Sequence, residues 1–328
     1  MKKLKFFIIL FALLIGLMAY FENLQIGSTF AQEGGLVAKY VEGRIPLTDP
    51  KNEIWGKVNG MEVSLGPQLT ALPWIHPEPS IRSLSVKAIN NGSWISFRLE
   101  WSDETKDEIV KVDSFRDAVA IMLGLQAGVG QCMGTPTAEA LIAHWKADFQ
   151  RDIDKAFSDI AELYPNFWSD WYIMAVGKPP YDLPSIYTNY TKIFVGGWAV
   201  NNPLSNPYKL TPVETLVAGG WGTLTTYKIQ QFIGKGIYEE GKWKVVISRP
   251  LITGEKDPQW FKGPVEIAFA AWDGAKGEVG AKKGVSLPML LTLEKPVTGG
   301  FSPSIWQWFA VLGAWVLAIA IILLIGRK

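Results

Sequence analysis

The residues of this sequence that could bind a metal are few, and several of them lie in one short segment. The stretch GQCMG, residues 130–134, holds the single cysteine, Cys132, followed by Met133 and Gly134. One of the two histidines, His144, follows a short distance along the chain. Packing is the ordinary role of a methionine. A loop flanked by glycines gives Met133 little to pack against, which makes it a candidate ligand.

Several kinds of chemistry are excluded by what the sequence lacks. A single cysteine allows neither an intrachain disulfide nor the Cys-x-x-Cys-His attachment of c-type haem, so any haem would be held by coordination and packing alone. His76, His144 and Cys132 lack the paired spacing of a zinc site. No nucleophile elbow, phosphate-binding loop or dinucleotide fingerprint occurs. We expect the carboxylate pairs 103–104 and 107–108 to form a solvated turn.

Composition favours a mainly β domain with no role in nucleic-acid binding. The chain has 328 residues, 48% hydrophobic and 19% charged, with a formal net charge of +1. Nucleic-acid binders normally carry a clear excess of basic residues. The 15 tryptophans, 20 prolines and 32 glycines suit a sandwich or barrel with many turns and an aromatic-lined cavity.

The N-terminus reads as an export signal. Lys2, Lys3 and Lys5 precede the apolar run 6–19, which is too short to be a comfortable transmembrane span. We predict a signal peptide over residues 1–31, cleaved after Ala31. An uncleaved anchor is the alternative, because the segment between the apolar run and Ala31 is long.

The C-terminus predicts a membrane anchor. Residues 305–325 contain one polar side chain, Gln307, and Arg327 and Lys328 follow. A helix of this length spans a hydrocarbon core of about 30 Å. The positive-inside rule then places the tail in the cytoplasm. We predict a linker over 297–304, a transmembrane helix over 305–326, and an exported body on the periplasmic or extracytoplasmic face of the membrane.

The region between these ends, residues 32–296, is predicted as one β-sandwich domain with inserted helices and loops. In WISFRLEW the apolar Phe97, Leu99 and Trp101 alternate with polar residues, as in a half-buried strand. Further strands are expected at 117–123, 191–200, 221–229, 242–251 and 265–274. Apolar residues at three- and four-residue steps predict one amphipathic helix over 148–164.

The order of short motifs identifies a family resemblance that covers roughly residues 92–294. WISFRLEWSD is followed by DSFRDAVAIM, CMG, LIAHWKADF, AGGWGTLT, GKWKVVISRPL, IAFAAWDG and KKGVS. This series resembles the haem-b-binding gamma subunit of ethylbenzene dehydrogenase and its relatives in dimethylsulfide dehydrogenase, selenate and chlorate reductases and nitrite oxidoreductase. The resemblance implies a β-sandwich that holds one noncovalent haem b, with a methionine and a lysine as axial ligands.

Carried onto this sequence, the family's methionine falls on Met133 and its lysine on Lys283, with Lys282 as the alternative. Trp145 is expected in the wall of the haem pocket. A methionine thioether raises the reduction potential of haem iron relative to two histidines. A lysine amine binds iron only when deprotonated, a form that burial favours. With both axial positions filled, the iron relays electrons and leaves substrate no place to bind.

The function implied by the resemblance is that of a non-catalytic b-type cytochrome subunit. It would serve a membrane-associated respiratory molybdoenzyme complex, such as nitrite oxidoreductase or a nitrate, selenate or chlorate reductase. Its partners would be an iron–sulfur beta subunit and a molybdopterin alpha subunit. The chain departs from many relatives by its predicted membrane helix and by SLPM after the lysine, where they carry a tryptophan.

Three alternatives stay open on the sequence. The sandwich could be a haem-free carbohydrate-binding module whose tryptophans stack on sugar rings. It could be a membrane-anchored b-type cytochrome that works without molybdoenzyme partners. The iron could also be bound by His76 and His144 in place of Met133 and Lys283.

Overall fold

The computed structural model describes residues 35–69, 76–124, 133–158, 160–166, 202–206, 208–253 and 265–295. The signal peptide predicted over 1–31, the strand over 191–200, the linker over 297–304 and the anchor over 305–326 lie outside these ranges. Within them, no helix is both long and apolar enough to cross a membrane.

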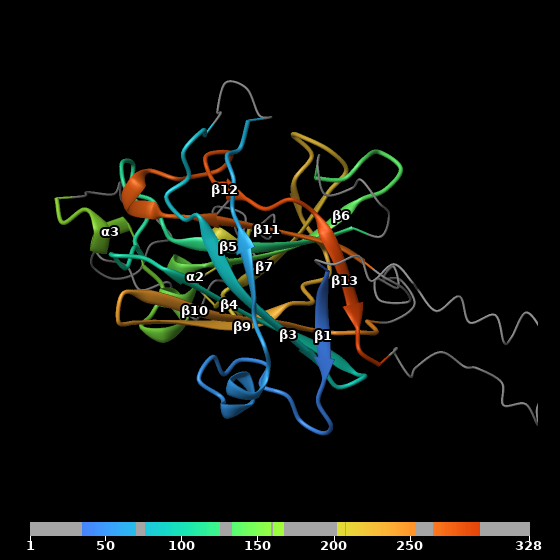
Figure 1. Ribbon diagram of the computed structural model, residues 1–328. Coiled ribbons are helices and arrows are strands. Elements are labelled where there is room, and N and C mark those ends of the chain that lie inside the picture. Colours follow the sequence, from blue (N-terminus) through green and yellow to red (C-terminus); the bar gives the residue numbers. More distant parts are fainter. Residues whose placement is uncertain are drawn as a thin grey trace, which may run out of the picture.

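The described strands form two facing layers, seen one above the other in Figure 1. The first layer contains β5 (Ala118–Gly124), β6 (Ala140–Lys146), β7 (Val213–Ala218), β8 (Thr225–Thr226), β11 (Val265–Trp272), β12 (Gly284–Val285) and β13 (Met289–Leu293). The second layer contains β2 (Met61–Ser64), β3 (Ser83–Asn90), β4 (Trp94–Ser102), β9 (Ile233–Glu239) and β10 (Lys242–Pro250). Strand β1 (Leu36–Tyr40) joins the layers, because it pairs in parallel with β13 on one side and β3 on the other.

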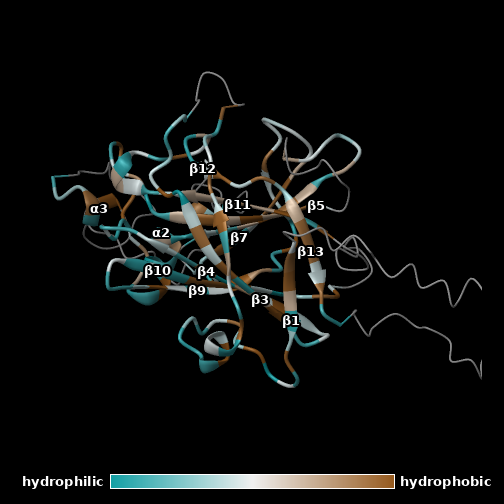
Figure 2. Ribbon diagram, in the orientation of Figure 1, coloured by the Kyte–Doolittle hydropathy of each residue, from teal (hydrophilic) through white to brown (hydrophobic). Residues whose placement is uncertain are grey.

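The core lies between the layers and is built by alternation along each strand. Phe97, Leu99 and Trp101 of β4 face Val119 and other inward residues of the first layer, and all of them are buried. Figure 2 shows hydrophobic colour along the strands of both layers and hydrophilic colour in many of the connecting loops. The mainly β sandwich expected from the sequence is therefore present. A short 3-10 helix, η1 (Glu53–Lys57), packs Trp55 against the outer side of the second layer.

The strands predicted at 94–101, 117–123, 242–251 and 265–274 correspond to β4, β5, β10 and β11. The strand predicted at 221–229 is reduced to the two residues of β8. The remaining strands, β1, β2, β3, β6, β7, β9, β12 and β13, are not predicted by the sequence patterns.

The single helix predicted over 148–164 is wrong. The chain forms α2 (Ala147–Asp154) and a separate short helix, α3 (Ile160–Leu163). After α2 the Asp152 carboxylate accepts a 3.0 Å hydrogen bond from the backbone N–H of Ser158, which favours a turn over further helix. Phe149 of the predicted apolar face is buried, but Ile153 and Ile160 are exposed, so little packing supports a longer helix.

The acidic segment after β4 is only partly the solvated turn that the sequence predicted. Glu104 is exposed, as expected. Asp103 is 6% exposed and lies at the end of the core. The reason is that Asp103 still continues the strand geometry, with its backbone N–H bonded to the carbonyl of Gly241 across the sheet.

Three tryptophans close one end of the core. Trp145 packs edge-on against Trp243 with ring centroids 4.8 Å apart, and Trp101 lies 6.2 Å from Trp145. The backbone of Gly236 passes directly over Trp145: a Cβ at Gly236 would lie 2.2 Å from Trp145 Cζ2. Only glycine leaves room for this ring.

We therefore expect Gly236→Ala to lower the free energy of unfolding by about 1–3 kcal/mol, the usual cost of overpacking a core. Urea denaturation followed by tryptophan fluorescence measures this difference. Gly56→Ala is the control, because nothing lies within 4 Å of a Cβ at Gly56. Equal stability of the two variants would contradict the packing of Trp145 described here.

Candidate functional site

The first layer carries a second apolar surface on the side that faces away from the core, which we call the outer patch. Alternation places Val119 and Ile121 of β5 in the core, and Ala118 and Ala120 on the opposite side. The buried residues of the outer patch are Ala118, Ala120, Ile142, Leu216, Ala218 and Trp272. The partly buried Met122, Met133 and Ala270 pack against them.

Met133 lies at one end of the outer patch in a left-handed conformation, with φ 56°. Positive φ is uncommon for a residue other than glycine and is often found at functional sites. The conformation is held by neighbours: the carbonyl of Met133 accepts a 3.1 Å hydrogen bond from Gly220 N–H. Gly134 has φ 92°, and a Cβ there would lie 2.2 Å from the Ala218 carbonyl oxygen. The turn is thus fitted against the end of β7.

Lys283 lies above Trp272, another residue of the outer patch. Its Nζ is 4.9 Å from the centroid of the Trp272 ring. Burial lowers the pKa of Lys283 from its ordinary 10.5 to about 8. No carboxylate among the described residues forms an ion pair with it. The amine therefore loses its proton far more readily than a surface lysine, which is the property a nitrogen ligand to a metal needs.

Lys282, the alternative to Lys283, has the opposite environment. It is exposed, and its backbone N–H is bonded to the carbonyl of Val279 in a turn. The side chains of the two lysines point in different directions, and it is the Lys283 side chain that lies over Trp272. The structure thus brings Lys283, and not Lys282, to the patch that Met133 also contacts.

His144 also contacts Trp272, by stacking its ring on the indole. Its ring lies 4.8 Å from Trp272 at an interplanar angle of 28°. Burial, followed by the positive charges of Lys146, Arg116 and Lys283, keeps the pKa of His144 well below its usual value, so the ring is neutral. Its Nε2 is buried and has no hydrogen-bond partner among the described residues. Such an atom ordinarily has a partner, because burial without one is costly.

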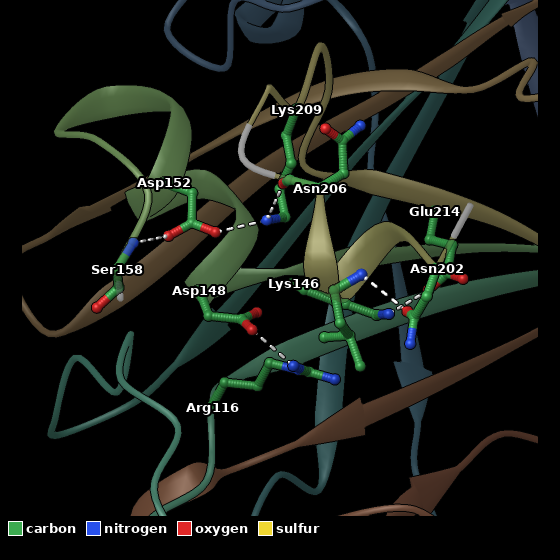
Figure 3. A network of polar contacts seen from close by, with 10 residues as sticks. Arg116, Lys146, Asp148, Asp152, Ser158, Asn202, Asn206, Lys209 and Glu214 are labelled. Atoms are coloured by element: carbon green, nitrogen blue, oxygen red, sulfur yellow. Dashed lines mark hydrogen bonds and ion pairs between the residues drawn. The ribbon is translucent and has the colours of Figure 1, made fainter. Parts of the chain in front are cut away.

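The basic side chains near α2 form ion pairs with carboxylates, in contrast to Lys283. Lys146 forms a buried ion pair with Glu214, which also accepts a 2.6 Å hydrogen bond from Thr226. Figure 3 shows this pair and the neighbouring ones, Arg116–Asp148 at 2.6 Å and Lys209–Asp152 at 2.7 Å.

Trp145 is not part of the outer patch. It is 0% exposed and packs in the core against Trp101 and Trp243. Adjacent residues of a strand point to opposite sides of a sheet, so His144 faces the patch and Trp145 faces away from it. The structure therefore places Trp145 in the core, whereas the aromatic residues of the patch are Trp272 and His144. Alternation along IAFAAW, with Phe269 inward, would have predicted the position of Trp272.

The two histidines have different surroundings. His76 Nε2 lies 2.8 Å from a carboxylate oxygen of Glu278, so this nitrogen is engaged with an acid. Of the two histidines, it is His144 that stacks on Trp272. A site formed jointly by His76 and His144 has no support in the described geometry.

Comparison with known proteins relates the chain to subunits of respiratory enzymes. The model of the ethylbenzene dehydrogenase family matches residues 52–166. The gamma subunit of dimethylsulfide dehydrogenase from Rhodovulum sulfidophilum is 24% identical over 76% of this chain and 76% of its own length. The gamma subunit of chlorate reductase from Ideonella dechloratans is 23% identical over 73% and 76%. A protein of Haloferax mediterranei named as respiratory nitrate reductase haem subunit ORF7 is 22% identical over 72% of this chain and 65% of its own length.

The chain is therefore similar to these gamma and haem subunits, which is the resemblance that its motif series predicts. Among solved structures, a family 9 carbohydrate-binding module from Caldicellulosiruptor kristjanssonii, in complex with cellotriose, aligns over 82% of this chain and 97% of its own, at 9% identity and a TM-score of 0.36. A similarity of that size supports no conclusion about function.

The partial burial of Lys283 has a consequence for the stability of the protein without cofactor. The unfolded chain binds a proton at Lys283 up to its ordinary pKa of 10.5, and the folded chain releases it at about 8. Between these values the unfolded state holds more protons, so stability rises with pH; below about 8 the full penalty remains. We expect Lys283→Leu to stabilise the cofactor-free protein at pH 7 by about 2–3 kcal/mol.

Urea unfolding of cofactor-free protein at several pH values measures this effect, with the exposed neighbour substituted in Lys282→Leu as control. The stabilisation by Lys283→Leu should decline as the pH rises above 8 and vanish above the ordinary pKa of lysine. A destabilised Lys283→Leu at pH 7, or an equal gain in Lys282→Leu, would show that the amine is not desolvated.

Proposed function

We propose that this chain is a b-type cytochrome subunit that transfers electrons within an oxidoreductase complex, with one noncovalent haem held on the outer patch. Met133 and Lys283 would be the axial ligands of its iron. The observation that carries the proposal is the position of these two residues, far apart in sequence, against one apolar surface.

The residues of the outer patch fit a haem in size and polarity. Ala118, Ala120 and Ala270 are small, and they make neighbouring stretches of β5 and β11 flat enough for a planar ring to approach. Trp272 offers an aromatic face beside them. His144 Nε2 is a buried polar atom without a partner, as expected beside a polar group that the structure does not include.

The donor set fits ligation that excludes substrate. Met133 supplies a neutral thioether on a turn whose backbone is fixed by Gly220, so little conformational entropy is lost when the sulfur binds. Lys283 supplies an amine whose pKa is already lowered to about 8, so the proton is displaced at small cost. When bound, haem supplies one-electron exchange at its iron.

The relatives indicate the kind of complex, and here our proposal follows their names. Two are gamma subunits of dimethylsulfide dehydrogenase and chlorate reductase, and one is a haem subunit of a nitrate reductase. We propose that catalysis resides in partner chains, a molybdopterin alpha subunit and an iron–sulfur beta subunit, and that this chain connects them to a further carrier. With one cysteine, it lacks the thiolates to hold a cluster of its own.

We further propose that the protein acts on the periplasmic or extracytoplasmic side of the membrane, after export by the signal over 1–31 and held by the helix over 305–326. Nitrite oxidation or nitrate reduction is the setting we favour. These elements derive from the sequence pattern, with the hydrophobic segment 305–325 as the main support.

The proposal predicts a specific pattern of haem spectra. Met133→Leu should remove the sulfur ligand and convert the low-spin spectrum of the reduced protein to high spin or to a new ligand state. Met122→Leu is the matched control, because Met122 also packs against the outer patch, from β5. The measurements are optical spectra of the reduced protein and electron paramagnetic resonance spectra of the oxidised protein, both on the full-length chain purified with haem.

The same spectra separate the rival ligand sets. Lys283→Leu should perturb the low-spin signal, and Lys282→Leu should not. Loss of the signal in Met122→Leu instead would assign the wrong methionine. Loss in His144→Ala with an intact signal in Met133→Leu would favour a histidine ligand and overturn the proposal. A protein with no haem at all would favour the haem-free sugar-binding alternative, which cellulose affinity would test.

The proposed partners predict association in the native organism. Affinity purification of the tagged chain from membranes should recover a large molybdenum-containing subunit and a cysteine-rich iron–sulfur subunit, because electron transfer requires the cofactors to lie close together. Elemental analysis for molybdenum and iron measures this. Full haem content without molybdenum would support the stand-alone cytochrome and contradict the complex.

A further inference from the structure

Three buried carboxylates meet at the end of the sandwich that the tryptophans close. Asp103 follows β4, Asp117 directly precedes β5, and Asp273 directly follows β11. One oxygen from each lies within 4.8 Å of the other two. Asp103 comes from the second layer, and the other two residues come from the first.

These side chains are withdrawn from solvent, unlike ordinary surface acids. Asp103, Asp117 and Asp273 are 6%, 0% and 7% exposed. None of them forms an ion pair with a described lysine, arginine or histidine. The buried Glu278 accepts a 3.0 Å hydrogen bond from Asp273 N–H and lies 2.8 Å from His76 Nε2, so a further acid stands beside the cluster. The cluster therefore concentrates negative charge where water cannot screen it.

The hydrogen bonds hold the carboxylates in place without using all of their oxygens. Asp117 accepts bonds from the indole N–H of Trp243 at 2.9 Å and from the backbone N–H of Gly274 at 3.0 Å and of Asp107 at 2.8 Å. Asp273 accepts a 3.1 Å bond from Lys276 N–H. These donors fix the orientation of the side chains, as the surroundings of a metal site do.

Asp103 provides the independent sign of a ligand. Its Oδ1 accepts a 3.1 Å bond from Thr105 N–H, but its Oδ2 is fully buried and has no hydrogen-bond partner in the part of the chain that the structure describes. Burial is the main cause that raises the pKa of Asp103; the indole N–H of Trp101, which opposes this shift, likewise has no hydrogen-bond partner among the described residues. A buried, charged oxygen without a partner is costly, so this oxygen is expected to have one.

The charge of the cluster needs relief by protons or by a cation. Burial, and next the charge of Asp103, raise the pKa of Asp117 to about 7 and that of Asp273 to about 6. Burial likewise raises the pKa of Asp103. At neutral pH the cluster would therefore retain excess negative charge unless a cation bound there.

We propose that Asp103, Asp117 and Asp273 form a binding site for a hard divalent cation, and that the cation is Ca²⁺. Carboxylate oxygens are the ligands of hard cations, and Ca²⁺ accepts the irregular geometry of three fixed side chains more readily than Mg²⁺, which demands a near-ideal octahedron. The set contains no nitrogen or sulfur ligand, which disfavours zinc and copper.

The role of this ion would be to join the two layers. It would bind the end of β4 to the start of β5 and the end of β11. β5 and β11 are also the strands that supply Ala118 and Trp272 to the outer patch. The site is nevertheless independent of the haem proposal, because its ligands and its test involve neither Met133 nor Lys283.

Calcium-dependent stability tests the site. The full-length protein, stripped with chelator, should gain about 5 °C in unfolding temperature in millimolar Ca²⁺, and much less in Mg²⁺. Asp103→Asn should lose this gain, because it removes one of three anionic ligands while preserving shape. Asp113→Asn is the matched control: Asp113 is an exposed aspartate of the same loop and should respond as the unmodified protein does.

Terbium luminescence gives a second readout that does not depend on a folded variant. Tb³⁺ bound beside Trp243 and Trp101 should be sensitised by tryptophan excitation, and Ca²⁺ should displace it. Absence of both a Ca²⁺ gain and Tb³⁺ emission in the unmodified protein would assign the charge relief to protons and overturn the proposal. An equal Ca²⁺ gain in Asp103→Asn would place the ion elsewhere and overturn it as well.

Discussion

A partly buried lysine with no acidic partner among the described residues is the feature on which the proposed function depends most. Lys146 and Lys209 are also buried, and each is neutralised by a carboxylate, Glu214 and Asp152. Lys283 instead has the face of Trp272 beneath its amine, and burial lowers its pKa to about 8. Desolvation of the Lys283 amine costs free energy, and a lysine that served only as a surface charge would remain in solvent. An amine that loses its proton readily and lies against an apolar surface suits coordination of a metal.

The two-sided first layer is the scaffold that makes this arrangement possible. One side of β5, β6 and β11 supplies the core, and the other supplies the outer patch. Successive residues of a strand point to opposite sides of the sheet. When Trp145 and Phe269 pack in the core, the neighbouring His144 and the outward-facing Trp272 are therefore placed on the outer patch. Met133 reaches the same patch from a loop, where its own backbone is left-handed. The next residue, Gly134, lies so close to Ala218 that no side chain would fit there.

Much of this architecture is readable from the sequence, and the failures have physical causes. Strands with clear alternation, such as β4, were predictable because one side of each packs in the core. The helix over 148–164 was predicted too long, because periodicity does not reveal that Asp152 caps the turn at Ser158. The family resemblance predicts a pocket role for Trp145, whereas alternation along β6 places it on the core side of the strand, opposite His144. The burial of Asp103 depends on pairing with Gly241, which no local pattern indicates.

The central claim is that one sulfur and one amine nitrogen bind a single haem iron on the outer patch. X-ray absorption at the iron edge of the oxidised, haem-loaded protein tests this most directly, since it distinguishes sulfur from nitrogen among the atoms bound to iron. We predict one sulfur together with nitrogens from the porphyrin and from Lys283. A first shell made only of nitrogen and oxygen would contradict the account.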